Sequence, residues 1–362
     1  MKIHKITGEK QLSVPASGPI YFGIDLHNRQ WQVTIRTEDV ELFHGSIPGN
    51  WEALQKLLDR YVTPTIHVVY EAGYFGYWLH DRLVEYGAAD CIVTPPSLIL
   101  QESGNRVKTD RLDSRKLAML LSRGMLKRVW VPDREGLGHR QIIRRRRQLV
   151  RDRVRVQCRM KAELRFYGIE FGEHQGRWSK KFVERLRCLN LGDRWKTVNF
   201  RQLIDEYDYL DGAIRKQNEM IKELASLERY NERAKILQTV PGIGLLAAME
   251  ILVELQDVSR FQRAKQLAAY VGLTPSQYSS GEHVRMGHIS RCGTSSLRGV
   301  IVEIAWRLIM KDEQLRKQYE EIKRRAGAKR AIVAIARRIL LRVRRMLLDG
   351  MPYCPRPMSA AA

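Results

Sequence analysis

Short apolar runs alternate with helix-like segments in the first third of the chain. Two of the runs lead into an acid, Asp25 and Glu71, and a third alternates between apolar and polar residues. Strands that alternate with helices predict an α/β sheet, which we assign to residues 20–135 after a polar lead-in at 1–19. The strand-like runs are 21–26, 31–35, 40–43, 65–71 and 91–94, and the helix-like segments are 50–61 and 74–86.

Long charged helical segments replace the strand pattern farther along the chain. Residues 136–236 predict two long helices, the second at 202–236, joined by a connection at 168–195 that is rich in Gly and Trp. Two such helices favour an antiparallel coiled coil. Residues 237–350 predict an all-helical unit, followed by a tail at 351–362. The fold class expected from the pattern is therefore α/β plus all-α.

The net charge of the chain predicts an anionic binding partner. The sequence holds 63 Lys and Arg against 40 Asp and Glu, a net charge of +23, and 44% of its residues are hydrophobic. That apolar content is enough for folded cores. A cationic surplus of this size favours nucleic acid, because Lys and Arg gain affinity by neutralising phosphates and releasing counterions.

Other partners and compartments fit the sequence less well. No apolar run approaches the roughly 20 residues that a membrane span needs, and residues 1–20 lack the apolar core of a signal peptide. The five cysteines are scattered and form no CxxC motif, which argues against a disulfide framework and a zinc site. We expect a cytoplasmic protein without a membrane partner.

Four acids form a candidate metal site. Asp25 and Glu71 lie at the C-terminal ends of predicted strands, where ligands of open α/β sheets bind. Asp110 and Asp113, three apart at the start of a predicted helix, share one face. Together they predict a site for Mg²⁺, which prefers carboxylate oxygens. The alternatives to a metal site are purely structural roles: a turn residue at Asp25 and an ordinary acid pair at a helix N-terminus at 110 and 113. This order of elements resembles the ribonuclease-H-like nuclease fold.

Segment 237–248 has the form of a helix-hairpin-helix around Gly242 and Gly244. Glycines allow close approach to a phosphate, and the following helix offers its N-terminal N–H groups. The alternative is a plain corner between two helices.

Two further groups are candidate nucleic-acid contacts, and each is also compatible with a solvated face. The first is the run Arg144, Arg145, Arg146 and Arg147, within a stretch, 139–165, that holds 11 Lys and Arg against two acids. The second follows Ser280, a serine before a glycine in a predicted loop, and comprises Arg285, Arg291 and Arg298. From the pattern alone, Ser280 is typical of a turn residue.

The ordered set of motifs resembles a known family, the DEDD insertion-sequence transposases of the Piv/MooV-like type, described as bridge-RNA-guided or seekRNA-guided serine recombinases. The similarity spans residues 20 to about 310. The motifs that carry it are Gly23-Ile24-Asp25, Tyr70-Glu71-Ala72-Gly73, 107–113, Pro241-Gly242-Ile243-Gly244, Gly272-Leu273-Thr274-Pro275, Ser280-Gly281, Ile289-Ser290 and Leu297-Arg298.

The resemblance implies a mechanism and partners. Residues 20–135 would be a RuvC-like domain with Asp25, Glu71, Asp110 and Asp113 as Mg²⁺ ligands, and Ser280 would form a 5′-phosphoserine with DNA. The helices of 136–236 would mediate assembly of dimers into a tetramer and grip RNA. A guide RNA encoded by the element would pair with donor and target DNA. Such a protein would work at the nucleoid of a bacterium.

Two other hypotheses compete with the RNA-guided transposase. One is a junction-resolving nuclease that uses the carboxylates alone and never forms a covalent intermediate. The other is a nucleic-acid-binding protein without enzymatic activity, in which the acids are caps and surface charges. Ser279, beside Ser280, leaves two candidates for the nucleophile; Ser280 is preferred because it directly precedes Gly281.

Overall fold

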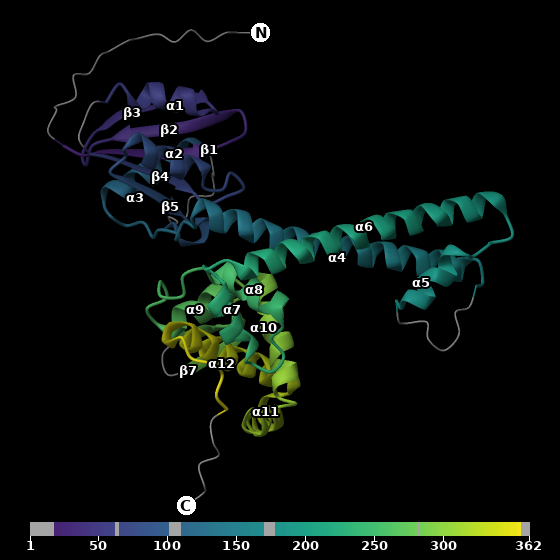
Figure 1. Ribbon diagram of the computed structural model, residues 1–362. Coiled ribbons are helices and arrows are strands. Elements are labelled where there is room, and N and C mark those ends of the chain that lie inside the picture. The colour runs from purple at the N-terminus through teal and green to yellow at the C-terminus, as the bar shows by residue number, and fades with distance from the viewer. Residues whose placement is uncertain (1–17, 62–64, 101–109, 170–177, 281–282, 356–362) are drawn as a thin grey trace, which may run out of the picture. The chain divides into compact units, whose positions relative to one another are not determined.

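The computed structural model describes residues 18–61, 65–100, 110–169, 178–280 and 283–355 (Figure 1). The chain divides into two compact units, with the boundary between Val131 and Pro132. The lead-in predicted at 1–19 and the end of the tail at 351–362 lie largely outside the described residues. No helix in the described ranges has the length and apolar content needed to cross a bilayer.

The first unit is built on a five-stranded sheet with the order β3-β2-β1-β4-β5. β1 pairs antiparallel with β2 and parallel with β4, and β4 pairs parallel with β5. This mixed sheet is consistent with the expected ribonuclease-H-like fold. Its elements are β1 (Ile20–Leu26), β2 (Gln30–Arg36), β3 (Glu41–Pro48), α1 (Trp51–Leu58), β4 (Ile66–Glu71), α2 (Trp78–Tyr86), β5 (Asp90–Thr94), η1 (Pro96–Leu98) and α3 (Asp110–Ser122).

Helices cover both faces of this sheet. Phe22, Ile24 and their neighbours on one face pack with buried residues of α1 and α2. Tyr21 and Val69 on the other face pack against Leu117 and Leu121 of α3. Successive strand residues face opposite sides, so a central strand between two helical layers must be apolar at almost every position. This explains the continuous apolar run in β1.

The second unit is helical apart from one hairpin. Its elements are α4 (Arg134–Phe166), α5 (Lys180–Arg187), α6 (Arg194–Ser226), α7 (Asn231–Gln238), α8 (Leu245–Leu255), α9 (Ala264–Val271), β6 (Pro275–Ser280), β7 (His283–Ile289), α10 (Ser295–Leu308), α11 (Glu313–Ala326) and α12 (Ala328–Asp349). Helices α7 to α12 enclose one large apolar core (Figure 1).

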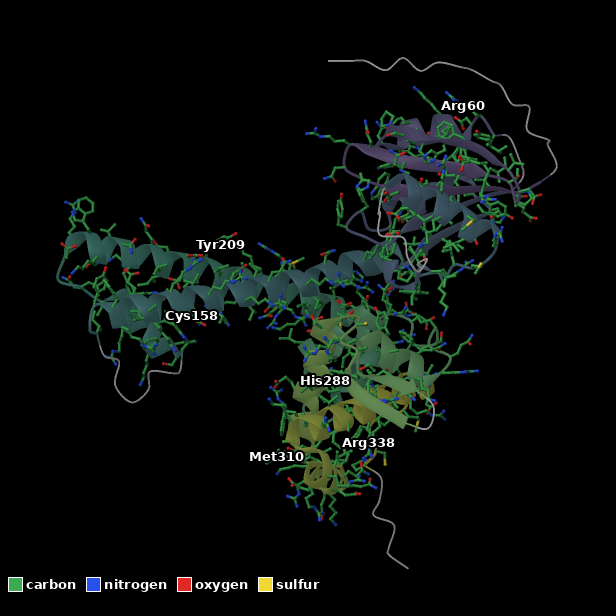
Figure 2. All side chains as sticks on the ribbon, turned by 180° about the vertical axis from the view of Figure 1, so that it is seen from behind. Arg60, Cys158, Tyr209, His288, Met310 and Arg338 are labelled. Carbon is green, nitrogen blue, oxygen red and sulfur yellow. The ribbon has the colours of Figure 1, made fainter. Side chains whose placement is uncertain are left out.

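Helices α4 and α6 form a long antiparallel pair, and Figure 2 shows Cys158 and Tyr209 on its two members. The direction follows from the cross-helix contacts, in which the α6 residue number falls as the α4 number rises. The contacts are Arg146 with Asn218, Arg153 with Asp211, Arg159 with Glu206 and Glu163 with Asn199. Apolar residues such as Val156, Met160, Tyr207 and Ile214 are buried between the helices.

Four sequence expectations for this unit need correction. Residues 237–350 are not all helical, because β6 and β7 pair as an antiparallel hairpin. Ser280 is therefore the last residue of a strand and not part of a loop. The second long helix spans Arg194–Ser226 instead of 202–236, and it ends early because Leu227 adopts an extended backbone and α7 begins separately. The connection at 168–195 contains the short helix α5.

A buried ion pair joins α4 to α8. Glu254 is 1% exposed and Arg140 is 7% exposed. Glu254 Oε2 lies 3.5 Å from Arg140 Nε, and Glu254 Oε1 accepts a hydrogen bond of 3.0 Å from Arg144 Nε. Removing one partner of such a pair leaves the other charge in a medium that cannot solvate it.

We expect Glu254→Ala to lower the free energy of unfolding by about 3–5 kcal/mol, because Arg140 would stay buried without its counter-charge. Urea unfolding followed by helical circular dichroism measures this. Glu219→Ala is the matched control, since Glu219 and its partner Lys222 are both exposed, and exposed pairs contribute at most about 1 kcal/mol. The paired replacement Arg140→Met with Glu254→Met should recover most of the loss. Equal effects of the two alanine variants would contradict this account.

Candidate functional site

The parallel register of β1 and β4 brings Asp25 and Glu71 to the same edge of the sheet. Ile24 pairs with Tyr70, so Asp25 and Glu71 are the next residues of neighbouring strands. Both side chains are partly exposed. The C-terminal edge of parallel strands is where ligands of open α/β sheets bind. The structure therefore brings together these two of the four predicted acids.

Helix α3 approaches this edge through Gly23. A Cβ atom on Gly23 would lie 2.3 Å from the carbonyl oxygen of Ser114 and 2.5 Å from the amide nitrogen of Ala118, so no larger residue fits. The Ser114 hydroxyl also hydrogen bonds to Thr34 of β2 at 2.9 Å. This contact fixes the first turns of α3 over β1, and Asp113 precedes Ser114 directly. Asp110 opens the helix, and its side chain lies outside the described part of the structure.

A histidine accompanies the acids at this edge. His27 Nε2 lies 3.1 Å from Asp25 Oδ2, in the turn between β1 and β2. Sequence reasoning did not single out His27, although its place two residues beyond Asp25 was a signal. Among the described side chains, which exclude that of Asp110, no three His, Cys, Asp or Glu residues gather into a group that could hold a metal. Carboxylates repel one another, which opposes such a cluster.

The glycine turn lies between α7 and α8. Gly242 has φ +96°, in the left-handed region, and a Cβ there would lie 2.8 Å from the Cβ of Arg307. Gly244 precedes α8 in an extended conformation, with open space where a side chain would be, and no side chain caps the helix. The turn therefore requires glycine at 242 for its backbone and its packing, while position 244 leaves the start of α8 accessible.

Three arginines of the run at 144–147 are held by protein groups. Arg144 binds Glu254, Arg147 binds Glu250, and Arg146 Nε donates a 2.6 Å hydrogen bond to Asn218 Oδ1. Burial and the neighbouring Arg151 hold the pKa of Arg147 below its ordinary value. Arg145 is exposed, and the described residues give it no such partner. These contacts fasten α4 to α6 and α8, and Arg145 is the member of the run without such a contact among the described residues.

Ser280 ends β6, where it pairs with His283 across the hairpin. Its side chain, like that of Arg285, lies outside the described part. Arg298 Nη1 donates a 2.9 Å hydrogen bond to the carbonyl of Val271, so it ties α10 to the end of α9. Arg291 is exposed and has φ +54°.

Close packing fixes the base of this hairpin. Gly272 and Gly293 both have positive φ, and a Cβ on Gly293 would lie 1.9 Å from the carbonyl oxygen of Tyr270. The segment before α10 therefore lies tightly against the end of α9. The amide of Ser290 also donates to the carbonyl of Thr274 at 2.8 Å. The hairpin carrying Ser280 rests on a rigid base.

Two family models match the chain. A DEDD transposase model of the IS110 type matches residues 22–169, which include β1 with Asp25, β4 with Glu71 and all of α3. A model of the transposase IS116/IS110/IS902 family matches residues 234–320, which include the glycine turn and the hairpin with Ser280.

Curated relatives resemble the chain over most of its length. A putative transposase, y4qE, of Sinorhizobium fredii is 29% identical over 73% of this chain, and the transposase for insertion sequence element IS1111A of Coxiella burnetii is 29% identical over 63%. The chain spans 64% of the length of each of these two relatives. The pilin gene-inverting protein of Moraxella bovis is 28% identical over 67% of both chains. By these matches, the chain carries transposase domains of the DEDD IS110/IS116 family.

Proposed function

We propose that this protein is an RNA-guided DNA transposase that cuts and rejoins DNA strands through Ser280. The observation that carries the proposal is the sheet edge of a DEDD-family domain, where the register sets Asp25 beside Glu71 and α3 lies over Gly23. The net charge of +23 supports an extended nucleic-acid partner.

The covalent step would conserve the energy of the DNA backbone. The Ser280 oxygen attacks a phosphorus atom, an Oγ–P bond forms, and the bond from phosphorus to the 3′ oxygen breaks. The serine proton goes to that oxygen, which leaves as a 3′ hydroxyl, and a 5′-phosphoserine remains. Attack by the 3′ hydroxyl of another strand reverses the step and joins the new ends. Because one ester replaces another, joining needs no separate energy source.

Asp25, Glu71, Asp110 and Asp113 would hold a divalent cation, for which we propose Mg²⁺. The donor chemistry fits, because carboxylate oxygens are hard ligands and both Asp25 and Glu71 are partly exposed at one edge. A cation bound there would draw the phosphate to the site and stabilise its developing charge. The protein itself orients these acids through the β1–β4 register and the close approach at Gly23.

The remaining parts would serve assembly and guidance. We assign residues 20–135 to the carboxylate domain, 136–236 to a coiled coil that assembles dimers into a tetramer and grips the guide RNA, and 237–350 to the serine domain. The turn at Gly242 and Gly244 would act as a helix-hairpin-helix on DNA. Asp25 and Ser280 belong to separate compact units, so a composite site can combine acids of one subunit with the serine of another. The protein would act at the bacterial nucleoid.

The test combines the purified protein, the noncoding RNA that flanks its element, Mg²⁺, and labelled donor and target DNA. We expect strand exchange products on a denaturing gel that disappear when the RNA is omitted or a chelator is added. A scrambled RNA of equal length is the control for nonspecific RNA binding. Products that persist with scrambled RNA would refute guidance. Free cleaved ends that are never joined would favour a carboxylate-only nuclease, and intact DNA under all conditions would favour a binding protein.

A further inference from the structure

A groove surrounds the first turn of α8. Three adjoining hollows meet there, between α4, α6 and α10, and all three share Ala247. Arg147 and Arg307 each line two of the hollows, as does Leu246. We call this surface the α8 groove. It lies entirely within the second unit.

Two exposed arginines border the groove without carboxylate partners among the described residues. Arg151 lies on α4 and Arg307 on α10, and both line the same hollow. The arginines of the 144–147 run that line the groove, in contrast, are bound to Asn218 and Glu250. One exposed acid, Glu303, also lines this hollow and offsets part of the charge. Arg151 and Arg307 are therefore the guanidiniums available to an anion.

The position of Arg307 is set by the glycine turn. Its side-chain stem lies over Gly242, where a Cβ atom would come within 2.8 Å of Arg307 Cβ and 3.3 Å of its Cδ. The stem is thus packed, while the guanidinium stays at the rim. A packed stem loses less conformational freedom on binding than a free one, which favours binding to a phosphate. The glycine turn contributes to the groove by seating this arginine.

The floor of the groove is apolar. Leu246, in the first turn of α8, is 37% exposed, and Ala247 and Val300 line the same hollow. An apolar floor with cationic rims matches single-stranded nucleic acid, whose bases are free to contact apolar surface while its phosphates reach the rims. A duplex hides its base faces, and an acidic peptide lacks the planar apolar groups. The N-terminal ends of α8 and α10 add partial positive charge to the rims.

We propose that the α8 groove binds one strand of nucleic acid, with its phosphates on Arg151 and Arg307 and a base against Leu246. This inference rests on the proposed function for the source of the strand, which we take to be the guide RNA, because α4 and α6, the helices assigned to RNA binding, line the groove. Its binding is independent of strand cleavage, so either can fail without the other.

The experiment measures fluorescence anisotropy of labelled single strands of uridine RNA and thymidine DNA, with a duplex of equal length for comparison. For the double variant Arg151→Ala, Arg307→Ala of the full chain, we expect at least a tenfold loss of single-strand affinity. The slope of log affinity against log salt should shrink by about 1.4, because each lost contact to a single strand contributes about 0.7. We expect the uridine RNA to bind more tightly than the thymidine DNA, and the reverse order would overturn the assignment of the strand as RNA.

The control is Arg324→Ala, which removes an exposed arginine of α11, a helix that lines none of the three hollows. It should bind like the wild type, and thermal unfolding should confirm that all variants are folded. A strand containing 4-thiouridine should crosslink to the peptide that holds Leu246. Unchanged single-strand affinity and salt slope in the double variant, an equal loss of duplex affinity in that variant, or crosslinks confined to other peptides would overturn the proposal. Normal strand binding without any DNA cleavage would instead contradict the proposed function, while the proposal that the α8 groove binds a single strand would remain supported.

Discussion

A Ser280→Ala protein is expected to form no covalent adduct with DNA and to lose strand exchange completely. The proposed intermediate is an ester of the Ser280 oxygen, and alanine has no atom that can form it. The measurement uses donor DNA labelled at the 3′ end of the cleaved strand, because that fragment keeps the 5′ phosphate bound to serine, together with the guide RNA and Mg²⁺, followed by a denaturing gel. The wild type should show a slow band that proteinase converts to free DNA.

The matched control is Ser279→Ala, which removes the same hydroxyl one residue earlier on β6. In the hairpin, Ser279 pairs with Val284 while Ser280 pairs with His283 next to the turn. We expect the adduct to survive in Ser279→Ala. Loss of the adduct in Ser279→Ala but not in Ser280→Ala would move the nucleophile to the neighbour. Cleaved ends without an adduct in all three proteins would identify a nuclease that uses the carboxylates alone.

The first unit shows how far sequence patterns reach when they report burial directly. The apolar runs that lead to Asp25 and Glu71 predict strands, and the structure has β1 and β4 at these places. The glycine at 23 gives no apolar or polar signal, yet it decides where α3 lies, because only glycine leaves room for the carbonyl of Ser114. That relation depends on two segments meeting, so periodicity within either one cannot predict it.

The second unit shows where local patterns fail. Strand β6 consists of Ser, Gln, Pro and a single Tyr, so it lacks the apolar alternation that marks a half-buried strand. The break between α6 and α7 occurs at Leu227 without Gly or Pro, and apolar spacing continues across it. The arginine run looks like a nucleic-acid contact because its acidic partners, Glu250 and Glu254, come from α8, about 100 residues later.

The pairing of arginines with distant acids determines which positive charges remain available to a ligand. Four arginines form ion pairs with carboxylates within the protein, namely Arg140, Arg144, Arg147 and Arg153. Arg145, Arg151 and Arg307 are exposed, and the described residues give them no such partner. Binding to phosphate should therefore depend more on dispersed arginines such as Arg151 than on the longest run. A charge run in sequence identifies a cationic protein, but the three-dimensional pairing determines which cations face a ligand.

Asp25→Asn is expected to lower the rate of strand cleavage by at least about a thousandfold while leaving the fold intact. The amide keeps the shape of the side chain but removes its negative charge, and metal-assisted phosphate chemistry depends on that charge. Single-turnover cleavage with saturating guide RNA measures the rate. Calorimetric titration with Mg²⁺ gives a second readout, in which the variant should bind more weakly than the wild type. Glu71→Gln should behave alike, since Glu71 occupies the neighbouring position on β4.

The control makes the same chemical change at the opposite end of the same sheet. Asp90 begins β5 and pairs at 2.8 Å with Arg128, whose side chain is 65% exposed. Losing such a pair costs at most about 1 kcal/mol, so Asp90→Asn should cleave DNA and bind Mg²⁺ like the wild type. If Asp25→Asn and Glu71→Gln both cleave within threefold of Asp90→Asn, the acids at this edge serve only the fold. If the two site variants lose cleavage and Mg²⁺ binding together while Asp90→Asn keeps both, the register of β1 and β4 has placed two carboxylates that act on the phosphate.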